Sequence, residues 1–218
     1  MRKLLIVVIS MLLMPVTAQD ITSKFREDQL YIGVAYPYFS TAPETLIQNK
    51  LSYAFSLGFV RDMPINKKRT LAVGLGMGWN ISKWFTNTQF SVSANRISAK
   101  TIPVDYQQNF LTMQSLEVPL EVRWRNTTAT KHAFWRIHAG VSLHIPLSAK
   151  TLFTSINGVD NHDFLPTNGT FLRGNVHFGF NTWNISIAHD IEGWAVSDSP
   201  NGEFDIKSTK IGLIFYLF

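Results

Sequence analysis

The sequence predicts an all-β fold, an eight-stranded antiparallel transmembrane β-barrel with an up-and-down meander, short periplasmic turns and long extracellular loops. Eight segments alternate residue by residue between large apolar side chains and small or polar ones, which is typical of strands. The connections between these segments are short and long in turn, as in outer-membrane barrels. Only 16% of the residues are charged, yet past the N-terminus no apolar run reaches the ~18 residues that a spanning helix needs.

The N-terminus predicts export. Residues 1–18 combine a basic start, an apolar stretch over Leu4–Met14 and small residues before Gln19, as a secretory signal peptide does. A signal anchor is the alternative, which the shortness of the apolar run disfavours. Residues 19–218 then form the barrel domain, located in the outer membrane after export. The chain has no cysteine, so we expect neither a lipoprotein anchor nor a disulfide.

The predicted strands follow one another without a linker or repeat. The alternating segments are 30–36, 52–60, 70–79, 115–125, 134–145, 172–180, 183–190 and 210–218. The short connections are 62–68, 126–131 and 181–182, and the long ones are 41–49, 80–111, 150–170 and 192–205. Within the second long connection, residues 90–98 alternate as well and predict an additional hairpin. Pro119 lies in the middle of a predicted strand, where it has no N–H to donate, so we expect a local bulge there.

The segment "TLAVGLGMGW" (residues 70–79) places Leu, Val, Leu, Met and Trp on one face and Ala or Gly on the other. In a membrane barrel the bulky face contacts lipid and the other face lines the lumen. Eight strands enclose a lumen that side chains fill, so long charged chains need small residues opposite them. We therefore expect a lumen network in which charges of both signs pair. Its expected members are Glu117, Glu121, Arg123, Arg125, Arg136, His138, His144, Arg173 and His177.

Aromatic residues predict membrane boundaries and contact points. Tryptophans at the ends of predicted strands suggest an interfacial girdle; they are Trp79, Trp124, Trp135 and Trp183. The long loops hold further apolar side chains that either contact a partner or pack against one another. These loop contact candidates are Trp84, Phe85, Phe164 and Trp194.

The chain ends in "IGLIFYLF", an apolar strand closing on Phe218. Such an ending, with Tyr216 and Phe218 as its aromatic positions, resembles the signal that the barrel assembly machinery reads. Both faces of this strand are apolar, so alternation leaves open which one meets lipid. With the segments "SLEVPLEVRWR" and "RIHAGVSLHIPLSAK", the ending resembles the PorT-like outer-membrane β-barrel proteins of Bacteroidota. The resemblance implies a barrel over the whole mature chain, in a family where most members have no assigned activity.

The function expected is a structural or interaction role in the cell envelope, without a channel, because eight strands leave no aqueous pore. Its expected partners are outer-membrane lipid, the assembly machinery during biogenesis, and an envelope protein bound through the extracellular loops. The net charge of +5 is scattered, so we expect no nucleic acid. "GLGMG" lacks the spacing and helix of a nucleotide loop, and no histidine spacing indicates a metal, so we expect no cofactor.

Two alternatives stay open. One is a lipid-modifying barrel enzyme of the deacylase or acyltransferase type, with Ser142 and His144 on one face and Glu121 as neighbour. The other is a secreted, lipocalin-like ligand-binding barrel, whose apolar face would point inward.

Overall fold

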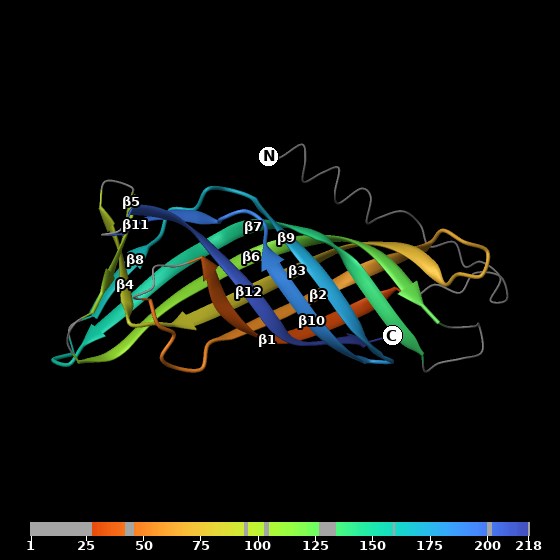
Figure 1. Cartoon of the computed structure of the whole chain (residues 1–218), viewed down its shortest axis with the longest axis horizontal. Coiled ribbons are helices and arrows are strands. Elements are labelled where there is room, and N and C mark those ends of the chain that lie inside the picture. The colour runs from red at the N-terminus through yellow and green to blue at the C-terminus, as the bar shows by residue number, and fades with distance from the viewer. Residues whose placement is uncertain are drawn as a thin grey trace.

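The computed structural model describes residues 28–41, 46–93, 96–102, 105–126, 134–158, 160–199 and 202–217. Eight long strands pair antiparallel in chain order, and pairing between the first and the last closes the barrel (Figure 1). They are β1 (Gln29–Thr41), β2 (Tyr53–Pro64), β3 (Leu71–Phe85), β6 (Tyr106–Arg125), β7 (Trp135–Ser155), β9 (Phe171–Phe180), β10 (Trp183–Asp190) and β12 (Gly202–Leu217). The predicted fold class is confirmed. The expected signal peptide, residues 1–18, and Phe218 lie outside the described residues.

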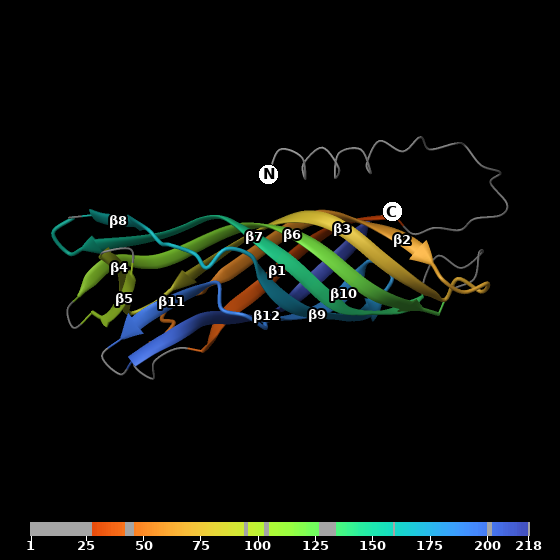
Figure 2. The same cartoon turned by 90° about the horizontal axis from the view of Figure 1, so that it is seen from above.

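Four short strands lie together at one end of the barrel, which we call the extended end; the opposite end, with the short connections, is the turn end (Figures 1 and 2). The short strands are β4 (Thr88–Ser93), β5 (Arg96–Thr101), β8 (Asp160–Phe164) and β11 (Ala195–Ser199). The expected hairpin over 90–98 is formed by β4 and β5. β5 also pairs in parallel with β11, which pairs with β12, so the hairpin is joined to the barrel wall.

The expected bounds of the long connection over 80–111 were wrong, because β3 and β6 run far into it. β3 continues to Phe85 and β6 begins at Tyr106, and the two strands pair up to Phe85 and Phe110. The period-2 alternation continues through these extensions, but the apolar and polar faces change sides. On β3, Trp84 points inward and Lys83 points outward.

The orientation of β3 is the expected one. Leu75 and Met77 are 46% and 43% exposed on the outer wall. Between them and their neighbours, Ala72, Gly74 and Gly78 are buried in the interior. The last strand, undecided by sequence, has Ile211 and Leu213 exposed and Tyr216 buried. A continuous apolar outer wall over most of the strand length is what contact with lipid requires.

The expected bulge at Pro119 was wrong. Pro119 pairs with Ser142 without a register shift, although the pairing of β6 with β3 is interrupted beside it. The bulge lies instead on β7 between Pro146 and Ser148, where Leu147 has no partner on β6. A bulge changes which residues point inward. On β7, the inward-facing residues before this bulge are mostly polar, whereas Ala149 just after it packs in an apolar cluster.

Among the described residues, no helix is long and apolar enough to cross a membrane.

Candidate functional site

The barrel interior holds charged side chains along most of its length. Among the residues that the structure describes, four acidic and five basic side chains are buried there. They are Asp62, Glu117, Glu121 and Asp190, with Arg123, Arg125, Arg136, Arg173 and Lys210. All nine residues of the expected lumen network are buried, including its three histidines. Buried charges are tolerated where opposite signs meet, so the pairs decide how the interior is held.

At the turn end, one carboxylate serves two arginines. Asp62 Oδ1 lies 3.2 Å from Arg123 Nη1, and Asp62 Oδ2 lies 2.8 Å from Arg125 Nη1. Arg123 also donates to Gln29 Oε1, and Arg125 Nε donates to the carbonyl of Arg69 at 2.8 Å. These bonds join β1, β2, β6 and the β2–β3 turn across the barrel floor.

The glycines of β2 and β3 make room for long side chains. A Cβ on Gly74 would lie 2.6 Å from Arg123 Cδ. A Cβ on Gly58 or Gly78 would lie 2.4 or 2.1 Å from the Tyr31 hydroxyl oxygen. Arg123 and Tyr31 therefore fill the space beside the small inward residues of β3. This is why the inward face of the strand carries almost no side chains.

Two carboxylates on β6 organise the middle of the lumen. Glu117 accepts a hydrogen bond from Tyr31 Oη at 2.5 Å and lies 3.6 Å from His144 Nε2. Glu121 is the second centre. Its oxygens lie 3.6 Å from Arg123 Nε, 3.8 Å from His138 Nδ1 and 3.5 Å from His177 Nε2.

Tyr216, expected in the assembly signal, lies inside this part of the barrel. Its ring centroid is 5.0 Å from that of His138, and the guanidinium carbons of Arg123 and Arg136 lie 5.4 and 5.7 Å from it. Its partner in the expected signal, Phe218, is outside the described residues.

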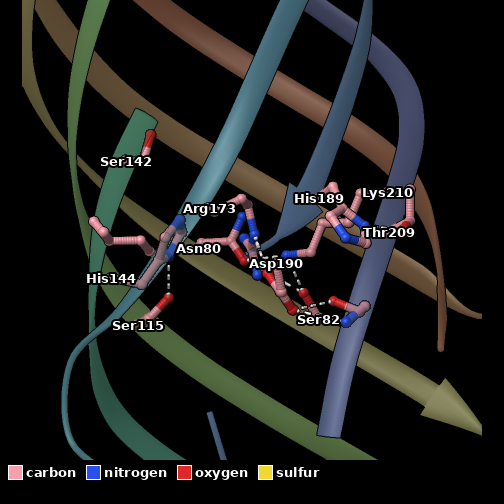
Figure 3. A network of polar contacts seen from close by, with 12 residues as sticks. Asn80, Ser82, Ser115, Ser142, His144, Arg173, His189, Asp190, Thr209 and Lys210 are labelled. Atoms are coloured by element: carbon pink, nitrogen blue, oxygen red, sulfur yellow. Dashed lines mark hydrogen bonds and ion pairs between the residues drawn. The ribbon is translucent and has the colours of Figure 1, made fainter. Parts of the chain in front are cut away.

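Toward the extended end, an ion pair joins the neighbouring strands β9 and β10, and a lysine on β12 reaches across the barrel to β3 (Figure 3). Arg173 Nε lies 2.6 Å from Asp190 Oδ1, and Asp190 Oδ2 accepts from the amide and hydroxyl of Ser208. Lys210 Nζ donates to Asn80 Oδ1 at 2.7 Å and to Ser82 Oγ at 2.6 Å. These bonds join β9, β10 and β12 to one another and to β3.

Three of the charged residues were missed by the sequence reasoning. Asp62, Asp190 and Lys210 each lie in phase with the inward residues of their strand, at or beyond the edge of the apolar run. Extending the period-2 pattern to the ends of each segment would have found them.

The interior encloses a cavity of about 60 Å³, lined by groups that include Glu117, Arg173, His177, Lys210 and Tyr216. Such a space holds a few water molecules. Within the described part of the chain, Arg173 Nη2 and Tyr216 Oη make no hydrogen bond to protein. A water in this cavity is the partner that such atoms ordinarily find.

The serine–histidine pair of the enzyme alternative is not assembled. Ser142 Oγ accepts from Asn175 Nδ2 at 2.5 Å, whereas His144 Nδ1 lies 3.0 Å from Ser115 Oγ. The His144 ring is fully buried and stacked on Phe171. A nucleophile must have its base within hydrogen-bond reach and a path for the substrate. Ser142 has neither, and Glu121 contacts other histidines.

No group of three or more histidine or acidic side chains in the described ranges is arranged to hold a metal ion.

At the extended end the interior changes from polar to apolar. An apolar core, which we call the extended-end core, fills it. Its buried residues are Trp84, Phe90, Ile97, Ala99, Leu111, Met113, Ala149, Leu165, Phe171, Trp194, Ala195 and Ile206. Trp84 and Trp194 are 0% exposed and stack with ring centroids 6.2 Å apart. Burying this apolar surface stabilises β4, β5 and β11 against the barrel strands.

This core corrects the loop contact candidates. Trp84 and Trp194 are inside it and offer nothing to a partner. Phe85 is half-buried and packs against Phe110, with centroids 5.8 Å apart. Phe164 is 71% exposed and is the most exposed of the four.

Exposed aromatic side chains ring the turn end. Trp124, Trp135 and Trp183 lie at strand ends there and are exposed, as expected of an interfacial girdle. Trp135 stacks on Phe178 with centroids 5.2 Å apart. Trp79 differs, because β3 continues past it to Phe85 and places it in mid-strand.

A family match agrees with this architecture. The model of a family described as outer membrane protein beta-barrel domain matches residues 17–192. No curated protein matches the chain. Among solved structures, Ail, the attachment invasion locus protein of Yersinia pestis, in complex with the heparin analogue sucrose octasulfate, is 13% identical. That match covers 89% of this chain and 100% of Ail, with a TM-score of 0.39.

Two further structures of Ail are similar to the chain. A second crystal structure is 12% identical over 89% of this chain and 100% of Ail, with a TM-score of 0.39. The structure of Ail in a phospholipid bilayer nanodisc is 12% identical over 88% of this chain and 100% of Ail, with a TM-score of 0.33. The family match spans well over half of the chain: the protein belongs to the outer membrane protein β-barrel domain family and is located in the outer membrane.

Proposed function

We propose that this protein is a non-conducting outer-membrane barrel that presents its extended end, on the cell exterior, as a rigid surface for an envelope or extracellular protein. The observation that carries the proposal is the apolar core of the extended end. Strands that extend beyond the membrane and share a buried core hold their surface residues in fixed positions, as recognition requires.

The polar interior supports the absence of a channel. Ion pairs and hydrogen bonds cross the lumen at three levels, at Asp62, at Glu121 and at Lys210. Purified protein in planar bilayers is expected to give no unitary conductance. Stepwise openings by the wild-type protein would contradict this part of the proposal.

A patch of the extended end carries the contact surface. Ile47, Leu51 and Ile156 are all exposed there. Their loops are tied together, because Lys50 Nζ donates to the Gln107 carbonyl at 3.4 Å and Gln107 Nε2 donates to the Ile156 carbonyl at 3.1 Å. Apolar side chains fixed in one exposed patch are typical of a protein-binding surface.

A photo-crosslinking amino acid at position 47, used on intact cells, tests this patch. Its matched control is position 65 in the β2–β3 turn, since Ile47 and Ile65 are both 59% exposed. The proposal expects one discrete protein adduct from position 47 and none of the same size from position 65. Identical adduct patterns at both ends, or no adduct at position 47, would contradict it.

Two finer assignments belong to the same proposal. The segments 115–125 and 136–150 and the apolar last strand support membership of the PorT-like barrels of Bacteroidota. The last strand, with Tyr216 and Phe218, supports insertion by the barrel assembly machinery. A chain lacking Phe218 is then expected to accumulate in the periplasm, and normal insertion of that chain would contradict the assignment.

A further inference from the structure

A row of side chains with unusual chemistry crosses the outer wall near the extended end. Lys83 on β3 pairs with Thr112 on β6, and Thr112 pairs with Lys150 on β7. Tyr53 on β2 and Phe164 on β8 continue the row on either side. All five residues belong to the outward-facing set of their strands, so the row has two cations, a hydroxyl between them and an aromatic ring at each end.

The row lies at the upper edge of the apolar wall. On β6, Thr112 is twelve residues from Trp124, which marks the girdle at the turn end. With ~3.4 Å per residue and a strand tilt of ~40°, the two are about 30 Å apart along the membrane normal. An apolar band is about 25 Å tall in such barrels, so the row lies level with the outer-leaflet headgroups.

Neither lysine is paired with a carboxylate of the described residues. Lys83 Nζ lies 3.5 Å from the ring centroid of Phe110 and 5.0 Å from that of Phe85. Lys150 Nζ lies 4.7 Å from the ring centroid of Phe164. In the part of the chain that the structure describes, no carboxylate forms an ion pair with either ammonium group. The rings hold both cations at the wall and leave their donors for an anion.

The spacing suits a phosphorylated headgroup. Lys83 and Lys150 are two strands apart, so their backbones are about 10 Å from one another. Both side chains can reach a phosphate placed over Thr112, whose hydroxyl is a further donor. Outward-facing Leu116 and Leu120 follow below Thr112 on β6, where acyl chains would lie.

We propose that the row of Lys83, Thr112 and Lys150 binds the phosphate of an outer-leaflet lipid headgroup, with Tyr53 and Phe164 flanking it. The two positive lysines complement the negative charge of a phosphate. They also lie at the level of the membrane where the outer-leaflet headgroups are found. The site goes beyond the proposed protein-binding patch, because it faces the membrane and uses different residues.

The test uses the full-length protein in phosphatidylcholine vesicles with added diphosphoryl lipid A, followed by native mass spectrometry of the extracted barrel. Parallel vesicles contain lipid A whose phosphates have been removed. The wild type is expected to retain the phosphorylated lipid and to lose the dephosphorylated one. Equal retention of both would overturn the proposal.

The variant K83Q/K150Q removes both charges, and K100Q is its matched control, since Lys100 is an exposed lysine on β5 of the extended end, outside the row. At about fivefold per lysine near a membrane surface, the double variant is expected to lower lipid retention roughly 25-fold. K100Q is expected to change it less than about twofold. Heat-modifiable migration of both variants shows that they fold.

Two outcomes would assign the row elsewhere and so overturn the proposal. If the lipid-free wild type binds inorganic phosphate as tightly as it binds diphosphoryl lipid A, and K83Q/K150Q loses that binding, the site binds a soluble anion. If the double variant keeps its lipid but loses the protein adduct formed at position 47, the row belongs to the protein-binding patch.

Discussion

The two halves of this barrel have opposite interiors although the same strands build both. In the membrane half β3 turns Gly74 and Gly78 inward around Arg123 and Tyr31. A few residues farther along, the same face of β3 carries Trp84, which is packed in an apolar core. The change is abrupt on β6 as well, where inward Ser115 is followed toward the extended end by Met113 and Leu111.

The difference teaches that the surroundings of the outer wall decide what fills the interior. Where the wall meets lipid, apolar side chains gain most on the outside, and the interior receives polar groups that pair with one another. Where the wall meets water, apolar side chains gain by pointing inward, as in any soluble β-structure. The bulge at Leu147 lies at this boundary and resets the phase of β7 between the two regimes.

The largest effect on stability is expected at Asp62, in the polar interior of the membrane half. Asp62→Asn leaves Arg123 and Arg125 buried without their carboxylate, and the expected cost is about 3–5 kcal/mol of unfolding free energy. Urea unfolding in lipid vesicles measures it. Asp205→Asn is the control, because its ion pair with Lys207 is solvent-exposed and is worth less than about 1 kcal/mol. Equal losses would mean that the interior charges do not hold the barrel.

An arginine placed on the outer wall tests whether the two halves of the barrel have different surroundings. Leu75 and Val196 are 46% and 40% exposed, but Leu75 lies in the membrane half and Val196 on β11 of the extended end. Leu75→Arg is expected to cost about 2–4 kcal/mol because it places a charge in lipid. Val196→Arg is expected to stay within about 0.5 kcal/mol, since its surroundings are water. The same unfolding experiment decides, and a similar cost at both positions would contradict the division.

The smallest effect is expected at the glycines that make room for Tyr31. Gly78→Ala forces the Tyr31 hydroxyl away from Glu117 and should cost about 1–3 kcal/mol. Gly174→Ala is the control, since its added Cβ meets nothing closer than 3.8 Å. The control is expected to be neutral or to stabilise by up to about 1 kcal/mol. Comparable destabilisation by both variants would mean that the glycines serve the strand backbone and not the space around Tyr31.

The membrane half could be predicted from the sequence because its outer and inner faces differ so strongly. Period-2 alternation gave the eight strands, their order and the inward direction of residues such as Glu121 and Arg136. It could not give their partners, because the contact of Glu121 with His177 joins strands far apart in the chain.

The sequence predicts long connections with one hairpin at the extended end, and not a continuation of the barrel strands, for a physical reason. Its alternation has the opposite sign, with Lys83 outward and Trp84 inward, so it does not continue the membrane pattern. The parallel pairing of Ser197 with Ile97 joins residues a hundred positions apart, and no local signal announces it. The burial of Trp84 and Trp194 depends on that pairing.

The central claim is that the bulky outer wall of the membrane half contacts lipid, and spin labels test it most directly. The chain has no cysteine, so single cysteines at Leu75, Leu120 and Val196 can carry a nitroxide each without background labelling. In reconstituted vesicles, the account predicts that the labels at 75 and 120 collide more with oxygen than with a water-soluble nickel complex, and the label at 196 the reverse. Preferential collision with the nickel complex at positions 75 and 120 would contradict it.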